Sequence, residues 1–351
     1  MFTKHRSVEM TVKPNLTIRE LARLAGVSIG TVSRALKGQP GPSASTRAEV
    51  LKMAEEHGYD LGRLRSGKTR RVLLVYNRSL QGSLAGNQFY SHVLHGAESA
   101  SREVDEVVLS VLSVAPSDDI AARIKRHEPD GLLIVGYFDT ECMDALRACE
   151  LPIVLADHFV PGLRCVNDDN LEGALLATRH LIEGGAQRVG AIFGPPVHHS
   201  IALRAKGFRR ALFEARILAD PDLEVTLDPE LPYAESAREA MRRLLALPER
   251  PDAVFAYNDM TALHAMETCH EAGIRVPQDI RFIGYDDIDA AAYSDPSLST
   301  IRLDKEALGY TAAMALIEGD TEAVDTLLPV ELVLRGSSVT EQPRAQRRRA
   351  R

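Results

Sequence analysis

The segment from Gly62 to Thr69, GRLRSGKT, matches the phosphate-loop pattern GxxxxGK[ST] in full. In nucleotide hydrolases this loop follows a buried strand and opens a helix, so that backbone N–H groups face the phosphates. Here a predicted helix precedes the pattern, and an apolar strand, RVLLVY, follows it. Because the order is reversed, we interpret the match as a chance resemblance and predict no nucleotide or other cofactor.

Two further patterns could bind metal or catalyse hydrolysis. His198 and His199 are adjacent, so they point apart in an extended chain, and no third ligand stands at short spacing. The chain has no GxSxG elbow and no cysteine–histidine set marked by its local sequence. The four cysteines lack a CxxC pairing, which indicates free thiols in a reducing compartment: Cys142, Cys149, Cys165 and Cys269. These patterns predict no metal site and no enzyme.

Residues 17–36, TIRELARLAGVSIGTVSRAL, have the spacing of two short helices joined by a tight turn. Thr17 can cap the first helix, with Glu20 three residues later. Gly26 can take the left-handed conformation that ends this helix, and Ser28 can cap the next. The result is a helix-turn-helix, whose second helix enters the major groove of DNA in many regulators. The alternative is a helical pair that serves only in packing.

The distribution of charge supports the DNA interpretation. Residues 1–71 hold 14 Lys and Arg against 6 Asp and Glu, a formal charge of +8, whereas residues 72–351 carry −15. A small basic head on an acidic body favours approach to DNA by the head.

The first 71 residues divide further. A third helix is predicted from about Ser45 to His57, capped by Ser45 or Thr46 and ended by Gly58. The basic stretch that follows is predicted to be a linker with cations beside the DNA backbone. We expect a flexible extension (1–15), a helix-turn-helix domain (16–58), a linker (59–71), a two-lobed body (72–338) and a basic disordered tail (339–351).

From residue 72 onward, short apolar runs alternate with helical stretches. Continuous apolar strands with helical crossovers indicate parallel sheets covered on both faces. Two successive sets of strands predict two doubly wound lobes: RVLLVY, EVVLSVLSV, GLLIVG, PIVLAD and CVNDD, then RVGAIFG, LEVTLD, DAVFAYND, RFIGYDD and STIRLD. Because ligands bind outside the carboxyl ends of such strands, we expect a polar cleft between the lobes.

The chain resembles the LacI/GalR family of ligand-controlled DNA-binding regulators from Leu16 to Ser338. The resemblance rests on the head motif together with STRAEVLKMAEEHGY, DGLLIVG, VNDDNLEGALLATRHLIEGGAQRVGAIFGP, RAKGF, DAVFAYNDMTALHAMETCHEAGIRVPQDIRFIGYDDI and LVLRGSS. It implies a cytoplasmic homodimer that reads a pseudo-palindromic operator, most often as a repressor. It also implies a helix-turn-helix head and a periplasmic-binding-protein-like α/β body, which holds a small effector, commonly a sugar.

The resemblance assigns DNA contacts to the head. Ile29, Gly30 and Arg34 match the base-reading positions, with Arg34 suited to a bidentate guanine contact. Ile29 could instead pack inside the head. The expected phosphate contacts are Thr17, Ser28, Thr31, Ser33, Arg63 and Arg65.

The resemblance also assigns an effector site. Arg204 matches the family's cleft arginine and Asp286 the carboxylate that faces it, a pair suited to sugar hydroxyls. The pair could alternatively form only an inter-lobe salt bridge. The remaining expected effector contacts are Phe89, Tyr90, Asp157, His198, Ser200 and Asn258.

The linker departs from the family pattern. It is about one turn shorter than the usual proline-containing hinge helix, lacks the proline, and contains Gly62 and Gly67, each of which costs about 1 kcal/mol in a helix. Leu64 is the expected minor-groove wedge. We predict a weak or absent hinge helix in the free protein.

Two other classes of protein share parts of this sequence pattern. A periplasmic sugar-binding protein would have a similar body, but it should carry a signal peptide and no basic head. The start MFTKHRSVEMTVKPN has no apolar run of that kind, and no stretch is long enough to span a bilayer. A transcriptional activator of the same architecture stays open as an alternative, and the residues do not identify the effector.

Overall fold

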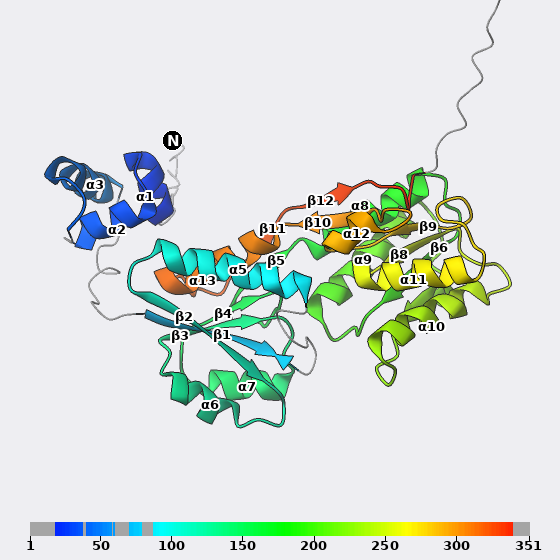
Figure 1. The fold of residues 1–351 in the computed structure, drawn as a ribbon, viewed down its shortest axis with the longest axis horizontal. Coiled ribbons are helices and arrows are strands. Elements are labelled where there is room, and N and C mark those ends of the chain that lie inside the picture. Colours follow the sequence, from blue (N-terminus) through cyan, green and yellow to red (C-terminus); the bar gives the residue numbers. More distant parts are fainter. Residues whose placement is uncertain (1–17, 38–39, 58, 60–69, 79–86, 340–351) are drawn as a thin grey trace, which may run out of the picture.

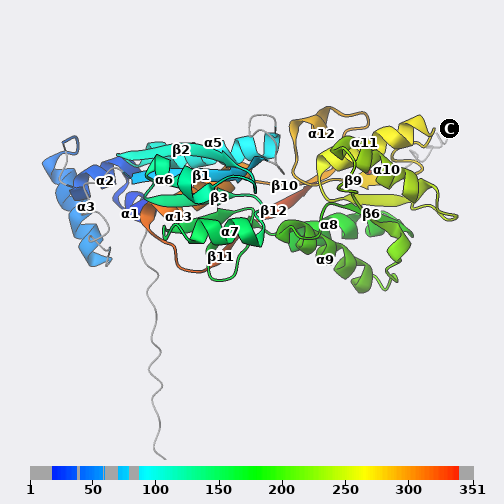
Figure 2. The ribbon, with the colours of Figure 1, turned by 90° about the horizontal axis from the view of Figure 1, so that it is seen from below.

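The computed structural model describes residues 18–37, 40–57, 59, 70–78 and 87–339. The predictions for Thr17, the hinge and its residues Arg63, Leu64 and Arg65 therefore lie outside the described residues, as do those for the N-terminal extension and for the tail from residue 340. Figures 1 and 2 show a small helical head at one end, beyond the first of two α/β lobes.

Three helices form the head: α1 (Ile18–Ala25), α2 (Ile29–Lys37) and α3 (Ala44–Glu56). Gly26 has φ of 64° between the first two, and the Ser28 hydroxyl accepts a hydrogen bond from the Thr31 amide at 3.1 Å, as predicted. The cap of α3 is Ser43 rather than Ser45 or Thr46, because extended Ser43 accepts from the Thr46 amide at 3.1 Å. The third helix thus begins one residue earlier than predicted.

The first lobe is built on a six-stranded parallel sheet in the order β11-β5-β4-β3-β1-β2. Its strands are β1 (Arg70–Asn77), β2 (Val107–Val114), β3 (Gly131–Val135), β4 (Ile153–Ala156), β5 (Arg164–Asp168) and β11 (Asp325–Leu328). Helices α5 (Gln88–Glu103) and α13 (Lys305–Glu318) cover one face, and α6 (Ile120–His127) and α7 (Thr140–Arg147) cover the other. Arg70 and Arg71, predicted as linker cations, begin β1, and Arg71 pairs with Glu128 at 2.6 Å.

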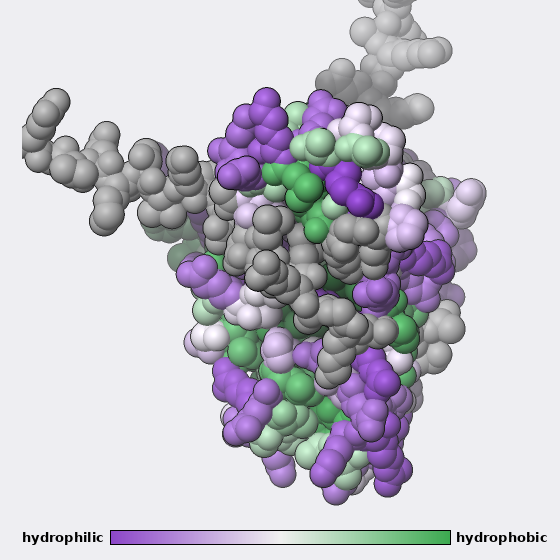
Figure 3. Space-filling view, turned by 90° about the vertical axis from the view of Figure 1, so that its left-hand side faces the viewer, coloured by the Kyte–Doolittle hydropathy of each residue, from purple (hydrophilic) through white to green (hydrophobic). Residues whose placement is uncertain are grey.

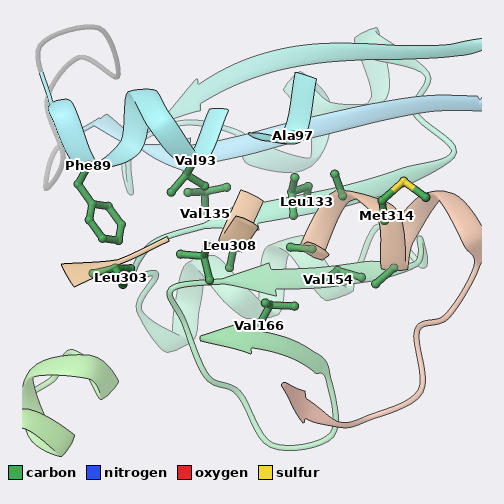
Figure 4. Packing of buried hydrophobic residues seen from close by; sticks show 14 of the residues in the cluster. Phe89, Val93, Ala97, Leu133, Val135, Val154, Val166, Leu303, Leu308 and Met314 are labelled. Atoms are coloured by element: carbon green, nitrogen blue, oxygen red, sulfur yellow. The ribbon is translucent and has the colours of Figure 1, made fainter. Parts of the chain in front are cut away.

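Helices α5 and α13 pack backbone to backbone over this sheet. A Cβ on Gly96 would lie 1.9 Å from the Glu306 carbonyl oxygen, and one on Gly309 would lie 1.8 Å from that of Val93. Figure 4 shows the apolar side chains beneath the two helices, among them Leu308 and Val135. The close approach ties the last helix of the body to the first.

The second lobe has a four-stranded parallel sheet in the order β7-β6-β8-β9. Its strands are β6 (Val189–Phe193), β7 (Glu224–Thr226), β8 (Ala253–Ala256) and β9 (Arg281–Ile283). Its helices are α8 (Asn170–Glu183), α9 (His199–Glu214), α10 (Tyr233–Leu245), α11 (Asp259–Glu271) and α12 (Asp289–Tyr293), and a 3-10 turn spans Pro221–Leu223. Helices α8 and α9 cover one face, and α10 and α11 the other.

The chain passes between the lobes three times: from β5 into α8, from β10 (Thr300–Leu303) into α13, and from β11 into β12 (Val330–Val333). Strand β10, predicted to belong to the second lobe's sheet, instead pairs antiparallel with β12 in a sheet of its own. That prediction was wrong because an apolar run of this length does not show which strand it will pair with. The crossovers place the ends of both lobes' strands side by side.

The surface at the head end is mostly polar, with smaller apolar patches between the polar side chains (Figure 3). Within the described part of the chain, no helix has the length and apolarity needed to cross a bilayer. Over the same residues, no three His, Cys, Asp or Glu side chains form a metal-binding group.

Candidate functional sites

Arg204 lies at the junction of the two lobes with only 5% of its surface exposed. Its guanidinium donates to the Asn170 side-chain oxygen at 2.7 Å, to the Tyr257 carbonyl at 2.5 Å and to Asp286 at 3.4 Å. It also stacks 3.5 Å above the centre of the Tyr285 ring. Such a buried cation is tolerated because Nε and Nη1 have hydrogen-bond acceptors and Nη2 faces a carboxylate.

A second carboxylate, Asp168, completes the surroundings of Arg204. It is fully buried, lies 4.0 Å from the guanidinium and accepts a hydrogen bond from the Tyr285 hydroxyl at 2.7 Å. The Tyr285 ring fits against α8 because position 173 is a glycine, where a Cβ would lie 2.5 Å from the Tyr285 hydroxyl oxygen. The arrangement leaves the planar face of Arg204 covered and its edge directed to acceptors.

Three aspartates at strand ends have positive φ, a conformation that is costly for residues other than glycine. The angles are 54° at Asp157, 103° at Asp286 and 49° at Asp287. The second is held by a hydrogen bond from its amide to the Ile301 carbonyl, and the third by ion pairs of its carboxylate with Arg302 and Arg335 at 2.5 and 2.6 Å. Strain of this kind is concentrated at ligand sites and hinges.

Burial disfavours the charged form of two of these carboxyls. It raises the pKa of Asp157 to about 7 and that of Asp286 to about 6, in each case against the opposing effect of Arg204. Asp157 also accepts a hydrogen bond from the Tyr90 hydroxyl at 3.0 Å. The group of Asp157, Asp168, Arg204 and Asp286 is hereafter the inter-lobe cluster.

The raised pKa of Asp157 predicts a pH-dependent stability. A carboxyl group whose pKa is higher in the folded chain than in the unfolded chain stabilises the folded state. This contribution is complete at pH values below the ordinary pKa of an aspartate, and it is lost as pH rises through about 7. We expect Asp157→Asn, whose amide oxygen can still accept from Tyr90, to raise the melting temperature more at pH 8 than at pH 5. Thermal unfolding of both chains at the two pH values measures the difference.

The control is Asp279→Asn. Arg275 holds the pKa of Asp279 below its usual range, so this carboxyl is ionised at both pH values and its replacement should have the same effect at each. An equal shift at pH 5 and pH 8 for Asp157→Asn would contradict the prediction.

Asn258 caps α11, where its side-chain oxygen accepts from the Thr261 amide and from the Tyr233 hydroxyl, both at 2.9 Å. Tyr233 at the start of α10 also hydrogen-bonds with the Thr261 hydroxyl at 2.7 Å. Part of the hydrogen-bonding capacity of Asn258 is therefore used inside the second lobe.

Two ring stacks join the lobes beside this cluster. Tyr137, after β3, stacks on His198 with ring centroids 4.4 Å apart, and Phe159, after β4, stacks on His199 at 4.6 Å. His158 lies between them in sequence and meets the Tyr137 ring edge-on at 5.4 Å. The two histidines at the start of α9 thus contact the opposite lobe through their faces.

The two aromatic residues predicted for the effector site lie in different surroundings. Phe89 is 9% exposed, and its ring packs with the first lobe's hydrophobic residues toward Leu303 (Figure 4). Tyr90, by contrast, reaches Asp157. Ser200, in the first turn of α9, is partly exposed. The structure therefore brings together Tyr90, Asp157, Arg204 and Asp286, while Phe89 has little surface left for a ligand.

In the head, Ser28 and Thr31 lie at the start of α2, with their hydroxyls 2.8 Å apart. Gly30 follows Ile29 in the first turn, and Ile29 is partly buried against hydrophobic residues, in the manner of the packing alternative. Ser33 is 1% exposed, so its hydroxyl is not presented to a phosphate in this arrangement.

Arg34 contacts the body. Its guanidinium lies 3.6 Å from the carboxylate of Asp105, which follows α5, and both side chains are 38% exposed. A Cβ on Gly30 would lie 3.9 Å from the Glu103 carbonyl oxygen. The surface of α2 predicted to read bases therefore faces the first lobe in the free chain.

Sequence reasoning missed several residues of the inter-lobe region: Tyr137, His158, Phe159, Asp168, Asn170, Tyr233, Tyr257 and Tyr285. Asp168 lies near the end of the predicted strand CVNDD, Asn170 directly follows that strand, and Tyr285 lies near the end of the predicted strand RFIGYDD. The position of these residues at strand ends was a usable signal for them.

Comparisons with known proteins cover both parts of the chain. Residues 17–60 match the model of bacterial regulatory proteins of the lacI family, and residues 178–338 match that of the periplasmic binding protein-like domain. The repressor PurR of Photobacterium profundum is 31% identical over 313 residues, which cover 86% of this chain and 91% of that protein. The repressor CytR of Escherichia coli K12 is 31% identical over 337 residues, 92% of this chain and 96% of that one.

The chain belongs to the LacI family of bacterial regulatory proteins. Solved structures of the family agree in fold. A complex of the regulator CelR with cellobiose superposes with a TM-score of 0.69 at 29% identity, covering 92% of this chain and all of that one. A lac repressor dimer bound to operator and the anti-inducer ONPF has a TM-score of 0.67 at 26% identity, covering 93% and 100%. The predicted helix-turn-helix head and α/β body are confirmed.

As a LacI-family member the chain is a DNA-binding transcriptional regulator, and its named relatives are repressors. The prediction that it is not an enzyme agrees with this family.

The contact between Arg34 and Asp105 predicts a small effect on DNA affinity. Exposed ion pairs contribute about 0–1 kcal/mol, so releasing Arg34 from the body should increase DNA affinity by no more than about fivefold. We expect Asp105→Asn to bind operator more tightly, as measured by fluorescence anisotropy at low salt. Glu98→Gln, which breaks an exposed ion pair within α5, is the control. Weaker operator binding by Asp105→Asn would contradict the view that the contact of Arg34 with Asp105 competes with DNA.

Proposed function

We propose that this chain is a cytoplasmic, dimeric LacI-family repressor whose operator affinity depends on a small effector held at the inter-lobe cluster. The observation that carries the proposal is the buried guanidinium of Arg204, shared between Asp286 and Asp168 where the chain crosses between lobes. A donor fork beside carboxylates suits the adjacent hydroxyls of a sugar or sugar derivative.

The related structures support this class of ligand. CelR was solved with cellobiose, and the lac repressor dimer was solved with operator and ONPF. In this chain, the groups proposed to contact the effector are Tyr90, Asp157, Arg204 and Asp286, with His198, Ser200 and Asn258 beside them.

The coupling acts through the lobes. An effector changes DNA binding only if it binds one arrangement of the two lobes more tightly than another. A ligand with equal affinity for both arrangements leaves the equilibrium between them unchanged. Strands and crossovers that meet at the cluster would transmit a change in lobe angle to the first lobe, and from there to the head of each protomer in the dimer.

An operator search tests the DNA-binding part. DNA from upstream of the chain's own gene should form a discrete complex in a mobility-shift assay, and its affinity should fall steeply between 50 and 200 mM salt. A scrambled duplex of equal length is the control. Equal affinity for both duplexes would contradict sequence-specific recognition.

A further inference from the structure

The recognition helix α2 contacts an acidic turn of the first lobe. The turn, residues 103–106 with the sequence EVDE, joins α5 to β2 and places three carboxylates within four residues. The Arg34 guanidinium lies 3.6 Å from the Asp105 carboxylate, and a Cβ on Gly30 would lie 3.9 Å from the Glu103 carbonyl oxygen. Two of the three positions predicted to read bases therefore lie against residues 103–106, hereafter the acidic turn.

Apolar packing joins the head to the body as well. The buried apolar side chains of the head and of the body belong to one contiguous cluster, and Ile29 and Val104 both pack against it. The body also fixes the acidic turn, because Glu106 has φ of 67° and its carbonyl accepts a hydrogen bond from the Arg70 amide at 2.9 Å. The contact of the head with the first lobe thus combines an ion pair with apolar burial.

Helix α5 connects the acidic turn to the inter-lobe cluster. Tyr90 in its first turn donates to Asp157 at 3.0 Å, and Glu103 at its other end begins the acidic turn. The two ends of this connection lie about 20 Å apart along the helix axis, because a helix rises about 1.5 Å per residue. Rigid helices carry displacements between distant sites, so a shift at the start of α5 reaches the acidic turn.

Helix α13 makes a parallel connection beside α5 (Figure 1). Its first residue, Lys305, donates to the Asp286 carbonyl, and Tyr310 donates to the Glu103 carboxylate at 2.6 Å. Glycines where the two helices meet let their backbones touch, so the helices move together. The α5–α13 pair therefore contacts both the inter-lobe cluster and the turn that holds the head.

We propose that the acidic turn is a docking surface for the recognition helix of the same chain, and that the α5–α13 pair links its position to the inter-lobe cluster. In the docked state Arg34 faces a carboxylate instead of the guanine acceptors of an operator. DNA must displace the acidic turn, so the apparent affinity falls in proportion to the fraction of heads that are undocked. The link to the cluster rests on the proposed function, whereas the docking itself does not.

Zero-length crosslinking tests the docking in the full-length chain without effector. A carbodiimide joins an amine to a carboxylate that it contacts, and Arg34→Lys supplies the amine. We expect a crosslink between position 34 and Asp105, identified by mass spectrometry in material that migrates as a single chain. Arg34→Lys combined with Asp105→Asn is the control and should not give this crosslink. Equal yields from the two chains would overturn the docking.

Competition with DNA is tested on the same Arg34→Lys chain. An excess of DNA from upstream of the chain's own gene should lower the crosslink yield at least about fivefold, because bound DNA draws the heads out of the docked state. A yield that is the same with and without this DNA would overturn the competition.

Tyr90→Phe tests the link to the inter-lobe cluster. It keeps the ring but removes the hydrogen bond to Asp157 at the start of α5. In the Arg34→Lys chain we expect it to lower the crosslink yield at least about twofold, and in the chain with Arg34 to tighten operator binding by up to about fivefold, the limit for an exposed ion pair. Tyr293→Phe, at an 89% exposed residue of the second lobe, is the matched control and should change neither quantity. An unchanged yield in Tyr90→Phe, or weaker operator binding as in a merely destabilised chain, would overturn the link.

Tyr310→Phe acts on the acidic turn itself. Loss of its hydrogen bond to Glu103 should lower the crosslink yield in the same way, and an unchanged yield would contradict the role of α13. No effector is present in these measurements, so an absent crosslink would refute the docking and leave the proposed effector response to its own test. A crosslink in a chain whose operator affinity responds to no bound sugar would contradict the proposed function instead.

Discussion

Arg204→Met lowers the free energy of unfolding of the body by about 3–5 kcal/mol and abolishes the response to effector. Removing one partner of a buried ion pair leaves the other charges uncompensated, which is the costliest way to break such a pair. Here Asp168 is fully buried and Asp286 is 13% exposed, so neither can recover full hydration. Urea unfolding followed by circular dichroism measures the loss.

Two comparisons separate this effect from a general loss of packing. Arg209→Met, on the same helix, removes an exposed arginine paired with Glu224 and should cost no more than about 1 kcal/mol. The loss in Arg204→Met should also be smaller at pH 5 than at pH 8, because protonation of Asp286, whose pKa is already raised to about 6, removes part of the repulsion. Equal destabilisation by the two variants would refute the assigned role of Arg204.

Arg34→Ala weakens specific operator binding by about 10- to 100-fold, the range expected for a bidentate contact to a guanine. The expected loss is specific: affinity for scrambled DNA should change far less, since phosphate contacts carry that binding. Arg34→Lys should recover only part of the affinity, because an ammonium cannot make the bidentate contact. Anisotropy titrations with specific and scrambled duplexes measure the specific and the non-specific affinity.

Lys52→Ala is the control for Arg34. Lys52 is a 74% exposed cation on α3, outside the recognition helix, and its loss should alter specific and non-specific binding alike. Should Arg34→Ala reduce affinity for both duplexes equally, Arg34 would be a phosphate contact rather than a base reader.

Much of the fold could be predicted because its signals are local. Continuous apolar runs such as residues 131–135 and 153–156 are strands buried on both faces, and the helices between them follow from the spacing of apolar residues. Strand β11 was missed because its sequence, DTLL, is short and half exposed at the sheet edge. Its partner β5 lies far away in sequence, so no local pattern could reveal the pairing.

The candidate site was predicted less completely. Arg204 and Asp286 could be assigned from motifs, whereas the partners of Arg204 come from the β5–α8 crossover and from the segments after β8 and β9, which only the fold brings together. Tyr285 is an aromatic residue after an apolar strand, a pattern typical of the core, and its role under the guanidinium appears only in three dimensions. Phe89 shows the opposite error: it was assigned to the effector site from a motif, but its ring packs in the hydrophobic core of the first lobe.

The head shows a third limit of sequence reasoning. The residues of α2 predict a DNA-reading surface, but not that Arg34 pairs with Asp105 in the free chain. That contact depends on the placement of the head against the first lobe, which helical periodicity does not encode.

The central claim is that binding of an effector at the inter-lobe cluster changes the affinity of the head for DNA. Its most direct test is the operator dissociation constant, measured by anisotropy with and without a saturating sugar that binds the body in a thermal-shift screen and serves as the probe. The account predicts a change of at least about fivefold in the wild-type chain, within the usual range of allosteric coupling, and none in Arg204→Met. The same dissociation constant with and without the bound probe in the wild-type chain would contradict it.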